Sequence, residues 1–209
     1  MATTDSVILE ARYDLRAIIS GAADTSLYTD PELFYYANRA LIQLDNVLSA
    51  MASDWVYNEA NVTLAPAASS AAVPTGCIMI RSAWISTTQL VKKSPEQLYR
   101  EKKYIGAATG EPYWFAEVGA NMQFDRTADT GYTVVTYYDK RATALATGAS
   151  MPYSDHFNGM IKEMIITLAH KRNEVNVFPD TAIYNFFMEK LMGRVIGRNH
   201  VPVRNRLDF

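Results

Sequence analysis

A capped amphipathic segment near the N-terminus is the feature that most constrains the fold. Asp30 is a good N-cap, and Pro31 and Glu32 suit the first turn of a helix. The apolar residues that follow recur at intervals of three and four, as one face of a helix requires. They are Leu33, Ala37, Ala40, Leu41, Leu44, Leu48 and Met51. The pattern predicts a helix over residues 31–52 whose apolar stripe must be covered by other elements.

Three further segments carry apolar stripes of similar length. They cover residues 6–20, 154–174 and 181–196. Ser154 or Asp155 can cap the second of these helices and Asp180 the third, while Gly21 and Gly197 suit helix ends. Stripes of matching length bury one another most simply by packing together, so we expect the terminal helices to form a bundle.

The middle of the chain has β-type patterns. Strands are predicted over residues 61–64, 77–86, 113–118, 122–126 and 132–139. Turn residues separate the last three, which predicts an antiparallel meander. A capping-box pattern from Ser94 to Gln97 predicts a short helix that ends near Tyr104. Two stretches of small residues, 66–76 and 141–153, are expected to be loops, the first mobile because it has nothing to pack.

These elements predict an α+β fold. N- and C-terminal helices form a helical bundle, and an antiparallel β module is inserted at about residues 58–150. We expect residues 1–197 to form a single domain, followed by an extended C-terminal arm over residues 198–209, where Pro202 opposes a continued helix.

The arm alternates cationic and apolar side chains. Its distinctive residues are Arg198, Val201, Val203, Arg204, Arg206, Leu207 and Phe209. The segment is too short to form its own core. It is either a frayed terminus or an arm that orders on a partner, by strand addition or by seating Leu207 and Phe209 in a groove.

The sequence lacks the usual signatures of catalysis. His156, His170 and His200 do not have the i, i+4 spacing of a zinc site, and Cys77 is the only cysteine. There is no nucleophile elbow, phosphate-binding lysine loop or dinucleotide-binding glycine turn. We therefore expect no metal, no cofactor and no enzymatic activity. A small enzyme with a site around His156 and Glu163 is the remaining catalytic hypothesis.

The acidic residues are interpreted as ordinary surface groups. The sets are Glu96 with Glu101, Asp125 with Asp129, and Glu163 with Glu174. Each set has lysine or arginine neighbours, which favours a solvated polar face. Asp125, Asp129 and Asp139 bracket a β turn and are expected to form turns rather than a calcium site.

Charge and hydropathy narrow the class of protein further. A net charge of −2 and a pI near 5.9 give no basic field of the kind that free nucleic-acid binders show. Residues 1–5 do not resemble a secretory signal, and no apolar run reaches the roughly 18 residues of a membrane span. We expect synthesis in a reducing cytoplasm.

Aromatic residues crowd the β module. They are Tyr113, Trp114, Phe115, Phe124, Tyr132, Tyr137 and Tyr138. Half or more should be core, but aromatics on both faces of short strands indicate that one face packs on the helices or on a neighbouring subunit. The candidate contact residues are Tyr113, Trp114, Phe115, Tyr137 and Tyr138.

The order of several short motifs matches a known pattern from Leu90 to Leu191. The matching pieces are Leu90, Ser94-Pro95-Glu96-Gln97-Leu98, Gly110-Glu111-Pro112-Tyr113-Trp114, Gly119, Tyr132, Tyr137-Tyr138, Leu145 and the capped helix from Ser154. In this order they resemble the bacteriophage head-to-tail adaptor family of connector or neck proteins, which includes the podophage tail tubular protein A. The helix from Asp30 to Met51, leading to Trp55, also fits the opening helix of that family.

The resemblance implies a structural protein of the virion. Members form a ring of about twelve copies beneath the portal protein. The ring connects the capsid to tail or nozzle proteins and surrounds the channel through which double-stranded DNA passes without specific binding. The resemblance gives residues 198–209 the role of a portal-docking arm. The alternative hypothesis is a non-virion binding module or assembly chaperone that holds a partner chain with the aromatic β face.

Overall fold

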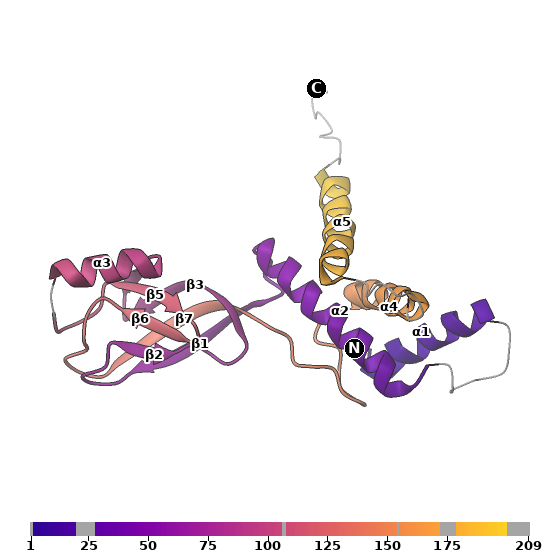
Figure 1. Ribbon diagram of the computed structural model, residues 1–209, viewed down its shortest axis with the longest axis horizontal. Coiled ribbons are helices and arrows are strands. Elements are labelled where there is room, and N and C mark those ends of the chain that lie inside the picture. Colours follow the sequence, from indigo (N-terminus) through magenta and orange to yellow (C-terminus); the bar gives the residue numbers. More distant parts are fainter. Residues whose placement is uncertain (1, 20–27, 106–107, 154, 172–178, 200–209) are drawn as a thin grey trace, which may run out of the picture. The chain divides into compact units, whose positions relative to one another are not determined.

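The structure is a computed structural model that describes residues 2–19, 28–105, 108–153, 155–171 and 179–199 (Figure 1). The chain divides into two compact units. Unit 1 comprises residues 1–47 and 143–209, and unit 2 comprises residues 48–142. Over the described residues the fold is mixed α+β, with five helices and a seven-stranded sheet, which confirms the predicted class.

Unit 1 is built from helices. They are α1 (Thr4–Ile19), α2 (Asp30–Ala50), α4 (Asp155–His170) and α5 (Asp180–Asn199). The helix expected to stop at Gly197 continues to Asn199, so Arg198 belongs to α5 and not to an extended arm. One glycine costs a helix only about 1 kcal/mol, which neighbouring residues can offset. The remainder of the predicted arm, residues 200–209, lies outside the described residues.

Among the described side chains, the apolar stripes of α1, α2 and α4 are buried within unit 1, as are Ile183, Phe187 and Leu191 on α5, and α1 packs against α4. On α2 the stripe predicted from the sequence is fully inside from Leu33 to Leu48. The predicted loop after residue 142 is anchored to α2 by two hydrogen bonds. The Asn38 side chain donates to the carbonyl of Leu145 (3.1 Å) and accepts from its N–H (2.6 Å). Within the described ranges, no helix is long and apolar enough to cross a membrane.

Unit 2 is a single curved sheet with one helix. Its strands are β1 (Tyr57–Leu64), β2 (Ser70–Ala72), β3 (Cys77–Ile85), β4 (Thr88–Lys92), β5 (Trp114–Val118), β6 (Asn121–Phe124) and β7 (Tyr132–Lys140). The order across the sheet is β1-β7-β3-β4-β5-β6-β2, and every pair is antiparallel except β4 with β5. Helix α3 (Pro95–Ile105) follows β4 and packs on β5.

The predicted meander is wrong. Strands β5 and β6 form a hairpin around Gly119, which has a φ of 60°, but β7 leaves this hairpin and pairs with β1 and β3. Turn residues show where a chain reverses, but they do not identify the strand beside which the next segment lies. Strand β4 was not predicted, because Leu90 is its only buried side chain.

The stretch of small residues at 66–76 was also misread. It contains β2, which pairs with β6, and Ala71 is buried. Ala68 and Val73 of the same stretch also pack against the core of unit 2.

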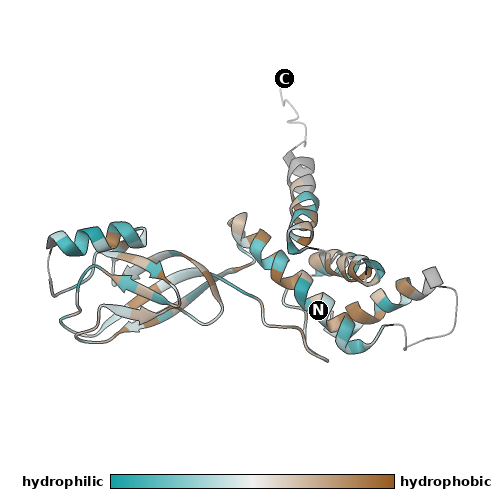
Figure 2. Ribbon diagram, viewed as in Figure 1, coloured by the Kyte–Doolittle hydropathy of each residue, from teal (hydrophilic) through white to brown (hydrophobic). Residues whose placement is uncertain are grey.

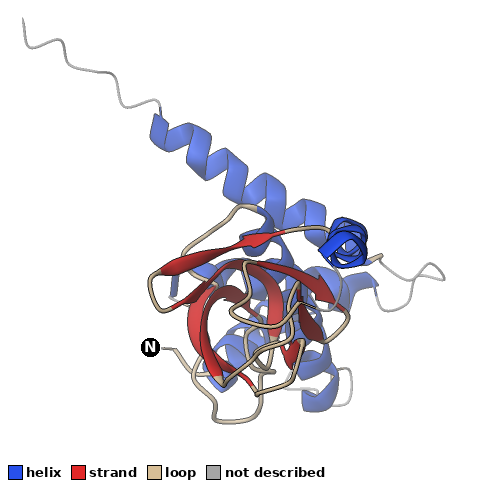
Figure 3. Cartoon of the chain, turned by 90° about the vertical axis from the view of Figure 1, so that its left-hand side faces the viewer, coloured by secondary structure: helices blue, strands red, loops and turns tan. Residues whose placement is uncertain are grey.

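The core of unit 2 lies inside the curve of the sheet, as the bent strands in Figure 3 show. Along β7 the side chains of Val134, Thr136 and Tyr138 are buried on this inner side, as the two-residue period of a strand requires. The inner cluster is Val62, Leu64, Ala71, Ile80, Ala83, Ile85, Leu90, Phe115, Met122, Phe124, Ala128, Val134 and Tyr138. Surface contacts of unit 2 must therefore come from the outward-facing positions.

Candidate interaction surface

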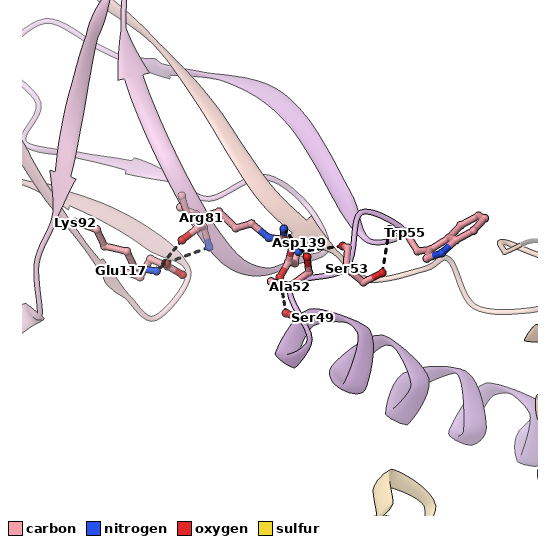
Figure 4. Close-up of polar contacts among 9 residues, drawn as sticks. Ser49, Ala52, Ser53, Trp55, Arg81, Lys92, Glu117 and Asp139 are labelled. Carbon is pink, nitrogen blue, oxygen red and sulfur yellow. Dashed lines mark hydrogen bonds and ion pairs between the residues drawn. The ribbon is translucent and has the colours of Figure 1, made fainter. Parts of the chain in front are cut away.

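A buried ion pair marks one part of the outer face of unit 2. Asp139 directly follows the inward-facing Tyr138 on β7, so its side chain points outward, yet it is fully buried. The Nε of Arg81, on β3, donates to Oδ1 of Asp139 at 2.5 Å. The hydroxyl of Ser49 donates to Oδ2 at 2.6 Å (Figure 4). Asp139 is thus a structural anchor and not the turn former that the sequence suggested.

The same arginine fixes the loop before β1. Its two terminal nitrogens donate to the carbonyls of Ala52 (3.1 Å) and Ser53 (3.0 Å). Ala52 adopts a φ of 51°, a conformation that most residues avoid, and the contacts from Arg81 help to hold it there. The loop then presents Trp55, which is 55% exposed, on the surface (Figure 4).

Two tyrosines lie beside each other on β1 and β7. The rings of Tyr57 and Tyr137 stack with centroids 5.8 Å apart and planes 5° from parallel, and the Arg81 guanidinium lies 5.3 Å from the Tyr57 centroid. Glu59 is directly opposite Tyr137 in the ladder, and its negative charge raises the pKa of Tyr137. The outer face here therefore combines a flat aromatic surface with an exposed carboxylate.

A second aromatic pair lies at the start of β5. The Lys93 ammonium is 3.5 Å from the Trp114 ring centroid, and the Arg126 guanidinium is 4.4 Å from that of Tyr113. Asp125 fixes the backbone of this turn, because its Oδ1 accepts hydrogen bonds from the backbone N–H groups of Tyr113 (2.9 Å) and Trp114 (3.0 Å). Only 3% of Asp125 is exposed, so the prediction of a solvated carboxylate is wrong.

Another ion pair lies where β4 separates from β3. Lys92 and Glu117 form an ion pair there (Figure 4). The Lys92 ammonium donates to the carbonyl of Ile80 (2.7 Å), and the N–H of Ile80 donates to Glu117 (3.1 Å). These side chains take the hydrogen bonds that a neighbouring strand would otherwise make.

Burial, followed by the charge of Glu117, raises the pKa of Cys77 to about 11, so its thiol stays protonated at neutral pH.

The structure separates the five predicted contact residues into two groups. Phe115 and Tyr138 are in the core and have no side-chain surface to offer a partner. Tyr113 is 47% exposed, and Trp114 and Tyr137 are partly exposed. Only these last three can take part in a contact at the surface of unit 2.

For the other predicted sites, only some of the residues are among those described. Of the arm, Arg198 lies in α5, and its side chain is outside the described set, as are residues 200–209. Glu163 lies on α4 and pairs with Lys190 at 2.9 Å on an exposed surface, while the His156 side chain is not among those described. Among the described residues, no three histidine, cysteine or acidic side chains gather as a metal site would require.

Sequence reasoning missed the cluster of Arg81, Asp139 and Ser49 and the neighbouring Trp55 and Tyr57. One signal was present, because Arg81 interrupts the otherwise mostly apolar strand that follows Cys77. A cation in such a strand requires a partner, but the sequence could not show that the partner comes from β7.

The outer helix of unit 2 has a different character. Figure 2 shows α3 as largely hydrophilic, with Leu98 its buried apolar residue. Its surface carries Tyr99 (56% exposed), Tyr104 (83% exposed) and an ion pair between Arg100 and Glu96. This helix supplies exposed tyrosines that belong to neither aromatic pair.

Comparison with known proteins adds one finding. The family model described as SU10 adaptor protein matches residues 3–195, which covers unit 2 and most of unit 1. No curated protein matches the chain.

Proposed function

Because the chain belongs to the SU10 adaptor protein family, we propose that it is a head-to-tail adaptor of a bacteriophage virion, a structural subunit that joins the capsid to the tail. The match across residues 3–195 is the observation that carries this proposal. A structural adaptor family implies a role without catalysis. The finer likeness to the podophage tail tubular protein A is part of the same proposal.

In this proposal the subunits form a ring beneath the portal, in the neck of the virion, around the channel for DNA. The portal and the tail or nozzle proteins are the partners. A ring of about twelve copies has one kind of interface repeated around an axis, so each subunit needs two different complementary faces. The four helices of unit 1 form the bundle, and synthesis takes place in the host cytoplasm. The formal charge of −2 suits a channel that lets DNA slide.

The ring or tail contact is proposed to involve Tyr113, Trp114 and Tyr137. The two pairs of ring and cation at the start of β5 support this, because partly exposed aromatics beside cations are typical of interface hot spots. Asp125 holds the backbone of Tyr113 and Trp114 in place, so both rings are presented without a cost in ordering that turn.

Residues 198–209 are proposed to dock on the portal. Their alternation of cationic and apolar side chains supports binding outside the subunit's own fold. Because α5 extends to Asn199, a deletion that tests the arm should begin at residue 200, which leaves the helix intact. Such a chain should fold normally and lose portal binding, and normal portal binding by it would contradict the role of the arm.

The deciding experiment is mass photometry of the purified chain, alone and mixed with the portal protein of the same phage. A portal that gains the mass of one ring of copies is expected. No complex at micromolar concentration would contradict direct docking on the portal. Absence of the chain from purified virions would instead favour the assembly-chaperone hypothesis.

The aromatic contact has its own matched variants. Tyr113→Ala and Trp114→Ala should reduce ring formation on the portal about thirtyfold each, which corresponds to the roughly 2 kcal/mol of a hot-spot side chain. Tyr104→Ala is the control, because Tyr104 is more exposed but belongs to α3. Equal effects of Tyr104→Ala and Tyr113→Ala would show that the contact does not depend on the β5 pair.

A further inference from the structure

Strand β1 is an edge of the sheet in unit 2, with β7 on one side only. The hydrogen bond from the N–H of Lys140 to the carbonyl of Val56 (2.8 Å) fixes the phase of this antiparallel ladder. Because hydrogen-bonded pairs alternate, Asn58, Ala60 and Val62 direct their backbone groups toward β7. Glu59 and Asn61 therefore direct their N–H and carbonyl groups to the open side.

These backbone groups also lack another hydrogen-bond partner among the described residues. Among the residues that the structure describes, no turn, loop or side-chain hydrogen bond takes up the backbone groups of Glu59 or Asn61. Natural edge strands are commonly blocked by proline, lysine, a bulge or extreme shortness. β1 has eight residues in unbroken register with β7 and has neither proline nor lysine. Strand β2 contacts β1 but is hydrogen-bonded to β6, so the backbone groups of Glu59 and Asn61 stay available to a further strand.

Charge indicates what kind of strand can be added. Self-pairing of two β1 strands in the register that places Glu59 opposite Glu59 of the second copy would bring like charges together, and such like-charge pairs destabilise a ladder. The outward side of β1 carries Glu59 and the ring of Tyr57, next to Tyr137. Both a carboxylate and flat aromatic rings attract cations. A strand with a cationic face on this side and an apolar face on the inner side would be complementary.

The chain itself contains a segment with that pattern. From position 201 onward, Val201, Val203 and Leu207 share one parity, while Arg204 and Arg206 share the other. In a strand these two sets face opposite sides. The seven residues 201–207 would span about 23 Å, close to the length of β1. Pro202 stands at the start of the segment, where a strand tolerates proline.

We propose that the open edge of β1 receives residues 201–207 of a second copy of this chain as an added strand. The apolar residues then extend the inner side next to Ala60 and Val62, and the two arginines lie beside Glu59 and Tyr57. The proposal rests on the proposed function and deepens it, because it assigns residues 201–207 to a contact between copies in the ring and leaves the two ends of the 198–209 arm for the portal.

The experiment measures binding of a labelled synthetic peptide of residues 199–209 to the full-length chain by fluorescence polarisation. Asn61→Pro should abolish binding, because proline removes an N–H that points to the open side but none from the β1–β7 ladder. Glu59→Arg should weaken binding about fivefold by reversing the cross-strand charge. Glu189→Arg makes the same charge change on the exposed surface of α5 and should leave binding unchanged.

Circular dichroism and tryptophan fluorescence verify that each variant is folded. No binding of the peptide to the full-length chain, or equal binding by Asn61→Pro, Glu59→Arg and the unchanged protein, overturns the proposal. If the peptide fails to bind while the chain still forms a ring on the portal, only the strand addition is wrong. If the peptide binds at β1 but no portal complex forms, the proposed adaptor function is wrong and the strand addition stands.

Discussion

The two units of this protein hold their buried carboxylates through different kinds of contact. In unit 1 the hydroxyl of Tyr153 donates a hydrogen bond to the buried carboxylate of Asp45. In unit 2 the buried carboxylates of Asp125 and Asp139 each lie beside an arginine. The difference follows from topology. Helices satisfy their backbone locally, whereas strands far apart in sequence need specific anchors to fix their pairing.

The two units can also be observed separately. Trp55, Trp84 and Trp114 are the three tryptophans of the chain, and all belong to unit 2. Tryptophan fluorescence therefore reports the unfolding of unit 2, while far-ultraviolet circular dichroism is dominated by the helices, most of which belong to unit 1. Each substitution below can be assigned to a unit by comparing the two signals.

The largest effect is expected from Asp139→Ala. Removing this carboxylate leaves Arg81, whose side chain is 20% exposed, without its ionic partner, and frees the hydroxyl of Ser49. The loss should be about 4 kcal/mol of unfolding free energy, as for other broken buried pairs. It should appear in urea titrations followed by tryptophan fluorescence. Asp129→Ala, at an exposed carboxylate of the same unit, is the control and should cost much less.

An Asp139→Ala variant as stable as the Asp129→Ala control would mean that unit 2 does not depend on this anchor. The contrast between the units would then fail, and both cores would be explained by apolar burial alone.

The second effect tests unit 1. Ile161→Ala should cost about 3 kcal/mol, because it leaves a cavity among fully buried side chains of α4. Circular dichroism should show the loss. A shift of equal size in tryptophan fluorescence would show that the two units unfold as one cooperative system, and an unchanged fluorescence midpoint would show that they unfold independently.

How much of each unit could be predicted follows from the same contrast. The helices of unit 1 were recognised because the cap at Asp30 and the stripe from Leu33 to Leu48 are local signals. In unit 2 most strands were recognised, but their order was not, because the pairing of β7 with β1 joins residues 68 to 82 positions apart. The partner of Arg81 was hidden for the same reason.

The candidate surface was predictable to a similar extent. The excess of aromatics indicated a contact region, and alternation along a strand separates inward from outward residues once the strand is placed. It could not separate Tyr137 from Tyr138 in advance, because the sequence does not show which face of β7 turns inward, and the outward-facing Asp139 is buried as well.

The third effect is expected from Tyr153→Phe, which should cost about 2 kcal/mol, because the buried carboxylate of Asp45 loses a donor. Burial, followed by the hydrogen bond to Asp45, raises the pKa of Tyr153 above its ordinary value near 10. The native state therefore holds this proton more tightly than the unfolded state. Its contribution to stability is complete below pH 10 and is lost as pH rises above that value.

Urea titrations at pH 8 and pH 11 test this dependence. The unchanged protein should lose stability between them, and Tyr153→Phe should lose less, since it has no phenol to ionise at this position. An equal loss in both proteins would assign the alkaline sensitivity to other groups.

The smallest effect is expected from Ser49→Ala, which removes one of the two donors to Asp139 and keeps Arg81 in place. A single hydrogen bond of this kind contributes about 1 kcal/mol, so tryptophan fluorescence should report a loss well below that of Asp139→Ala. The ratio of the two losses of unfolding free energy shows how much the Ser49 hydrogen bond adds to the ion pair of Arg81 with Asp139. A small loss for Ser49→Ala means that the ion pair alone holds β3 to β7. A loss close to that of Asp139→Ala means that the three side chains act as one network, in which the carboxylate stays buried only while both of its oxygens are satisfied.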